Sequence, residues 1–148
     1  MGISIANTAL RAASGAFILN SGLGKLKLDE AGAAGLQQLA ANGVPQLAEL
    51  DPKVFGKLLS VGEIALGGAL LLPLVPSRLA GLGLGAFSAA LVASYLRTPG
   101  MTEADGLRPS ADGTALAKDV WLAAIAVALV FGRQSHKKDS KAKKSKKK

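Results

Sequence analysis

Residues 56–75 (GKLLSVGEIALGGALLLPLV) form a run that is almost entirely apolar but contains one carboxylate, Glu63. A helix of this length covers about 30 Å, at about 1.5 Å per residue, which matches the core of a bilayer. An ionisable group inside such a helix costs about 3 kcal/mol on insertion scales, so it should face other helices rather than lipid. The run therefore predicts a transmembrane helix whose Glu63 side needs a polar neighbour.

The composition agrees with a small helical membrane protein. Of the 148 residues 49% are hydrophobic and 18 are glycine, whereas only 4% are aromatic, a mixture typical of helices that pack closely in lipid. The chain has no cysteine and one histidine, which excludes disulfides, Cys-ligated metal clusters and multi-histidine metal or haem sites. We therefore expect no metal site and no cofactor.

The apolar pattern predicts an all-α fold, a four-helix transmembrane bundle formed by residues 1–133, with spans at about 5–24, 53–75, 79–96 and 117–132. The first span carries its polar residues at helical spacing on one side: Asn7, Arg11, Ser14, Ser21 and, at its end, Lys25. Such a helix either lies in the interface or crosses the membrane with its polar stripe turned inward. The polar partner that Glu63 requires favours crossing. The last apolar run is short, so either the helix continues outward through 115–119 or the bilayer thins locally.

The segment 26–51 predicts short amphipathic helices that lie on the membrane or cap the bundle. Asp29 is a helix N-cap candidate, and Asn42-Gly43 is a stop signal. Val44-Pro45 begins another short piece. Asp51 followed by Pro52 is a strong start signal for the second span.

The lysine-rich tail 134–148 is predicted to be disordered, and it holds most of the excess in a net charge of +8. The positive-inside rule places this tail in the cytoplasm, and four spans then place the N-terminus there too. The tail either binds anionic lipid or binds nucleic acid or an acidic partner. Because no aromatic residue interleaves the lysines, we favour anionic lipid and expect no nucleic acid partner.

Antiparallel packing of the first two spans places Glu63 near the level of Phe17. We therefore predict a buried polar cluster of Arg11, Asn20, Glu63 and either Lys118 or Asp119. Such a cluster is either a charge pair that fixes helix register or a proton-linked or quinone-adjacent site. The absence of a second carboxylate in mid-membrane favours the first interpretation.

Small residues recur every fourth position in the third span, at Gly81, Gly85, Ala89 and Ala93, and this ridge predicts close approach of another helix. The same stretch, GLGLGA, loosely matches a dinucleotide-binding pattern, but no strand precedes it and we reject that interpretation.

Three motifs together resemble the DoxX-like family of small bacterial integral membrane proteins, over about residues 5–131. They are LRAASGAFILNSGLGKL with Arg11, Gly15, Gly22 and Lys25; GEIALGGALLL with Glu63, Gly67 and Gly68; and Lys118-Asp119-Val120-Trp121. The resemblance implies a four-helix fold in the bacterial inner membrane and the role of an accessory subunit. The matching polar positions are Arg11, Lys25, Glu63, Lys118 and Asp119, and we assign helix packing to Gly15, Gly22 and Gly67. The lysine tail and the alanine-rich outer loop are additions to the family pattern.

Three classes of function remain open. The favoured one is a non-catalytic accessory or anchor subunit of a larger membrane complex, redox or quinone-linked as the resemblance implies. The second is a stabilising subunit of an envelope transporter, for instance a lipid transporter. The third, an autonomous quinone-linked enzyme, is least favoured because the chain offers almost no catalytic residues. In each case the bilayer and other membrane subunits are the expected partners.

Overall fold

The computed structural model describes residues 5–132, and within them the regular structure is helical, apart from one isolated bridge between Thr102 and Pro109. The helices, in chain order, are α1 (Ile5–Lys25), α2 (Glu30–Gly43), the 3-10 helix η1 (Pro45–Glu49), α3 (Pro52–Leu71), α4 (Ser77–Arg97), α5 (Thr114–Ala117) and α6 (Val120–Phe131). The all-α prediction is confirmed, and so are short helices in the segment 26–51. The predicted tail lies outside the described residues.

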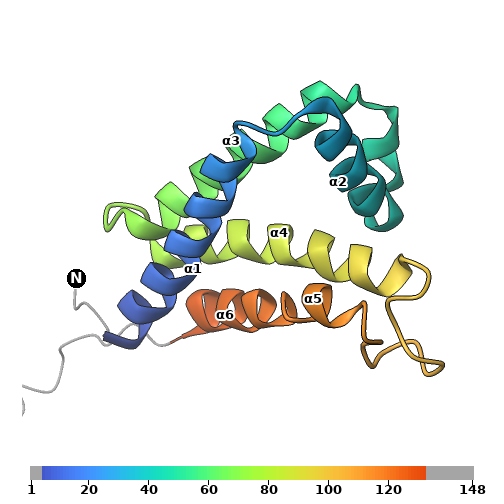
Figure 1. Cartoon of the computed structure of the whole chain (residues 1–148). Helices are drawn as coiled ribbons and strands as arrows, with labels where there is room; N and C mark the ends of the chain where they lie inside the picture. Colours follow the sequence, from blue (N-terminus) through green and yellow to red (C-terminus); the bar gives the residue numbers. More distant parts are fainter. Residues whose placement is uncertain (1–4, 133–148) are drawn as a thin grey trace, which may run out of the picture.

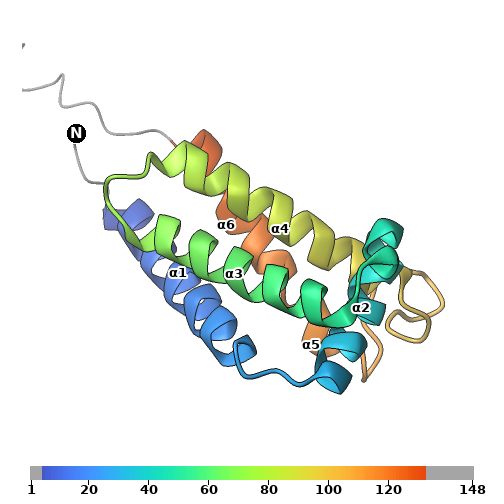
Figure 2. The ribbon, with the colours of Figure 1, turned by 90° about the horizontal axis from the view of Figure 1, so that it is seen from above.

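Two antiparallel helix pairs, α1 with α3 and α4 with α6, form a wedge (Figure 1). The pairs meet where α1 begins and α6 ends, and they diverge toward the opposite end, where α2 packs against both α3 and α4. Seen from above, α1 and α3 lie side by side (Figure 2). Helix α2 thus caps the open end of the wedge, one of the two places that the sequence suggested for it.

Within the described residues, three segments are long and apolar enough to cross a membrane: Pro52–Leu71, Ser77–Arg97 and Thr114–Phe131. Helix α1 is not among them, because Asn7, Arg11 and Asn20 lower its mean hydropathy. The four-helix transmembrane bundle of the sequence prediction is therefore not confirmed in full.

The helix starts follow local hydrogen-bonding rules. The Asp29 carboxylate accepts a 2.8 Å bond from the Gly32 backbone N–H, and Asp51 accepts bonds from the N–H groups of Lys53 and Val54. The end of α3 at Leu71, four residues before the predicted boundary, has an equally local cause. Pro73 disfavours helical geometry at the residue before it, and that residue is extended.

The core lies where the two helix pairs meet, so it joins all four long helices. Its buried members are Ile18, Leu70, Ala80, Leu84, Ala126 and Leu129. Each of these side chains is at most 3% exposed. Between apolar helices of this kind, close van der Waals packing of these side chains holds the contact together.

The short apolar run of α6 is extended toward its N-terminal side by α5 and the junction between them. Lys118 and Asp119 keep right-handed helical dihedrals between α5 and α6. Three i→i+3 backbone bonds, donated by Asp119, Trp121 and Leu122, tighten the junction. Of the two alternatives the sequence left open, the structure has the continued helical path, which gives an 18-residue segment.

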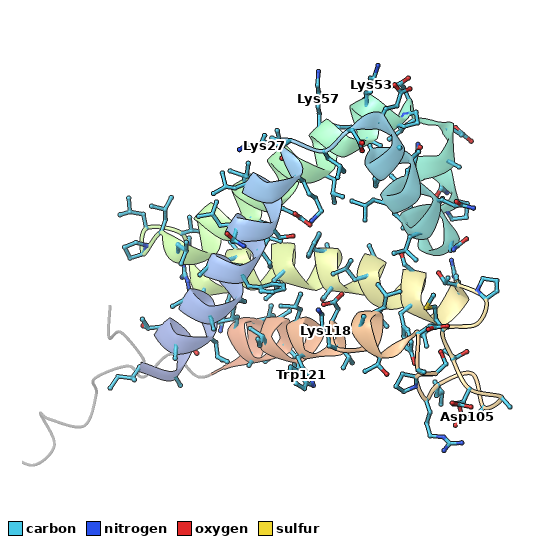
Figure 3. All side chains as sticks on the ribbon, viewed as in Figure 1. Lys27, Lys53, Lys57, Asp105, Lys118 and Trp121 are labelled. Atoms are coloured by element: carbon cyan, nitrogen blue, oxygen red, sulfur yellow. The ribbon has the colours of Figure 1, made fainter. Side chains whose placement is uncertain are left out.

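The link from Thr98 to Gly113 is held to α4 by the Tyr95 hydroxyl, which donates to the Leu107 carbonyl at 2.8 Å. At its tip, hydrogen bonds from the Arg108 guanidinium and from backbone N–H groups hold the pKa of Asp105 below its usual value. Asp105 lies in this loop, outside the apolar helices (Figure 3).

Candidate functional site

An ion pair between α1 and α3 holds the one carboxylate of the apolar run. Lys25 Nζ lies 2.9 Å from Glu63 Oε2 and 3.1 Å from Oε1, and it also donates to Ser21 Oγ at 2.6 Å. The ammonium group thus has three acceptor atoms within hydrogen-bond distance. The Glu63 side chain is 5% exposed and that of Lys25 is 19% exposed. The polar neighbour that Glu63 requires is therefore Lys25.

Glycine brings the two backbones close enough for this pair. A Cβ atom at Gly22 would lie 2.9 Å from Glu63 Cβ, and one at Gly67 would lie 2.6 Å from the Leu19 backbone nitrogen. Ser60, one turn before Glu63, donates to the Gly22 carbonyl at 2.8 Å. A larger side chain at either glycine would force the helices apart and lengthen the ion pair.

A second polar site lies at the other end of the same helix pair. The Arg11 guanidinium donates to the carbonyls of Ala69, Leu70, Leu72 and Val75 and to Ser77 Oγ, at 2.7–3.1 Å. These acceptors include the carbonyls that a helix leaves unpaired at its C-terminus, where a cation is also favoured by the helix dipole. Arg11 therefore fastens α1 to the turn between α3 and α4.

The predicted cluster of Arg11, Asn20, Glu63 and Lys118 or Asp119 is wrong in its membership. Arg11 binds the end of α3 and does not reach Glu63. Asn20 and Lys118 are exposed, and Asp119 is half-buried at the start of α6. The cause is the register: Gly22, not Phe17, lies opposite Glu63. The long connection 26–51 lets α3 begin well beyond the end of α1, so the two helix ends are not level.

The small residues singled out in the sequence lie at both helix interfaces. Gly15 and Gly22 face α3, Gly67 faces α1, and Gly81 faces α6, where a Cβ atom would lie 2.9 Å from Leu129 Cβ. Gly85 has looser contact, with 3.7 Å to Ala126 Cβ. Ala89 is exposed and lines a shallow apolar groove between α4 and α6, together with Gly85, Ala86, Ala123 and Val127.

The sequence did not signal the contacts that hold α2 in place. The Gln37 amide is buried and donates to the carbonyls of Leu47 and Leu50, which closes the α2–η1 corner. Asn42 donates to Thr98 Oγ1, and Arg97 donates to the Gly43 carbonyl at 2.8 Å. The polar residues of α2 are visible in the sequence, but they do not identify the backbone carbonyls that accept these hydrogen bonds.

The charged side chains of the Lys25–Glu63 pair and of Arg11 hold α1 to α3 and to the turn that follows it. Within residues 5–132, each buried polar side-chain atom has a hydrogen-bond partner, and the described residues contain no group of three or more His, Cys, Asp or Glu side chains placed to hold a metal ion. Comparison of the chain with models of protein families, with curated proteins and with solved structures finds no match.

Proposed function

We propose that the chain crosses the bacterial inner membrane four times, with α1 as the fourth crossing. The proposal is supported by the way α1 lies against α3: its charged side chains Arg11 and Lys25 are bonded to groups of α3 and of the turn that follows it. The beginning of α1 and the end of α6 also lie at the same end of the wedge (Figure 1), as an even number of crossings requires. The lysines after Phe131 favour a cytoplasmic location for that end.

Within that membrane we propose the role of a non-catalytic accessory or anchor subunit of a larger complex. The observation that carries this proposal is that the three charged side chains at the α1–α3 contact, Arg11, Lys25 and Glu63, are bonded between helices. Lys25 forms an ion pair with Glu63, and the Arg11 guanidinium donates hydrogen bonds to five acceptors. A proton-transfer or quinone site would need a polar group directed at a ligand. The resemblance to the DoxX-like family favours a redox, quinone-linked complex.

The expected contact with a partner subunit is the groove between α4 and α6. In a bilayer the occupant of such a groove is either an acyl chain or another transmembrane helix, and small residues favour close approach of a helix. Ala89 lies in this groove and is exposed, whereas Ala65 is an exposed alanine on α3, away from it. This pair of alanines provides a matched test.

Copurification from native membranes in mild detergent tests the proposal. A stoichiometric dehydrogenase supports the redox subunit, and transporter ATPase and permease subunits support the alternative, a stabilising subunit of a lipid transporter. A lone protein carrying quinone contradicts both. We expect Ala89→Phe to lose the partner and Ala65→Phe to keep it. Equal retention by the two variants would show that the groove is not the contact.

A further inference from the structure

One face of α3 near its beginning carries a lysine among exposed apolar side chains. Val54, Leu58 and Val61 are 47%, 59% and 60% exposed, and Lys57 is exposed between them. Their spacing places all four on one stripe of the helix. Because α3 is apolar enough to cross a membrane, this stripe faces acyl chains.

A second unpaired lysine lies at the same end of the α1–α3 pair. Figure 3 shows Lys27, Lys53 and Lys57 directed away from the body of the protein at this end. Lys53 is engaged by Glu30 at 2.9 Å. Among residues 5–132, neither Lys27 nor Lys57 forms an ion pair. Two exposed ammonium groups therefore remain without a direct ion-pair partner among these residues.

The position of Lys57 along α3 indicates which anion can bind these lysines. Lys57 is five residues past Pro52, or about 7.5 Å along the helix from its beginning. From this depth the aliphatic stem of a lysine is long enough to bring its ammonium to the headgroup level. The abundant anionic group at that level is the phosphate of a phospholipid. A soluble acidic protein would reach Lys27 but would not cover Leu58 and Val61.

We propose that Lys27 and Lys57 form a binding site for the headgroup of an anionic phospholipid, with an acyl chain lying along Leu58 and Val61. The site is separate from the lysine tail, and it does not depend on which complex the protein joins. It requires only that α3 is in the bilayer. Each lysine near a membrane surface strengthens attraction to anionic lipid about fivefold.

The test is a lipid titration of the full-length protein, followed by native mass spectrometry, with phosphatidylglycerol compared with phosphatidylcholine. We expect Lys27→Gln and Lys57→Gln each to lower the preference for phosphatidylglycerol about fivefold, and the double variant to lower it by more than tenfold. Lys118→Gln is the control, because Lys118 is exposed on the other helix pair and the adjacent carboxylate of Asp119 offsets its charge. It should change the preference by less than twofold.

A second variant separates this site from the tail. The substitutions Lys146→Gln, Lys147→Gln and Lys148→Gln remove charge from the tail. In this background the Lys27/Lys57 double variant should lower the preference for phosphatidylglycerol by the same factor as it does with the wild-type tail. The proposal is overturned if the double variant keeps the wild-type preference, or if Lys118→Gln lowers it equally. Equal thermal unfolding midpoints will show that both exposed substitutions leave the fold intact.

Discussion

Breaking the Lys25–Glu63 ion pair from one side should destabilise the protein far more than removing both charges. Removal of one partner from a buried ion pair costs about 3–5 kcal/mol, because the remaining charge is left unpaired. Lys25→Met keeps the length of the stem but leaves Glu63, 5% exposed, without a counter-charge. We expect this variant to lose about 3 kcal/mol, the lower end of the range, because the lysine is itself 19% exposed.

The opposite single variant should be milder. In Glu63→Leu the lysine can turn its ammonium toward the interface, so we expect a loss of about 1–2 kcal/mol. The double variant replaces a buried ion pair by apolar side chains, which is often close to neutral. We therefore expect it to lie within about 1 kcal/mol of the wild type. The two substitutions are then coupled by about 3–6 kcal/mol.

The assay is equilibrium unfolding of the reconstituted protein in mixed micelles, followed by far-ultraviolet circular dichroism, for the wild type and the three variants. Coupling of the expected size would show that the pair fixes the packing of α1 on α3. Additive losses in the double variant would refute the reasoning, since they would mean that each side chain acts without the other.

Three further predictions use the same unfolding assay. Arg11→Lys cannot reproduce the fork of hydrogen bonds to the end of α3, so we expect a loss of about 3 kcal/mol, and unchanged stability would contradict the capping role. Gly67→Ala places a methyl group against the Leu19 backbone and should cost about 1–3 kcal/mol, whereas Gly62→Ala, with open space around it, should be neutral or stabilising. Asp51→Ala removes the cap of α3 and should cost about 1 kcal/mol, and a loss below a few tenths would argue against that cap.

Local features of the fold could be predicted from the sequence because they depend on a few neighbouring residues. The caps at Asp29 and Asp51, the stop at Gly43 and the polar stripe of α1 all follow from hydrogen-bonding capacity and helical spacing. The stripe faces α3, as the requirement of Glu63 for a polar partner suggested. The end of α3 differs most from the predicted boundary, because Pro73 disfavours helical geometry at Leu72.

The partners of the charged residues depended on a register that the sequence does not encode locally. A shift of about five residues between α1 and α3 moves Glu63 from the level of Phe17 to that of Gly22, which exchanges Arg11 for Lys25 as its partner. The register is set by glycine contacts between the two backbones, and these were visible in the sequence only as isolated small residues. The contacts of Gln37 and Arg97 with backbone carbonyls depend on the placement of α2 and have no sequence signature.

The most direct test of the account is whether α1 crosses the membrane beside α3. Because the chain has no cysteine, a membrane-impermeant maleimide will report a single introduced cysteine at either end of α1. Ala6 and Gly24 are both exposed, and a side chain at Gly24 meets open space. We predict that Ala6→Cys reacts from the side that holds the lysine tail and that Gly24→Cys reacts from the opposite side. Reaction of both positions from one side would contradict the account.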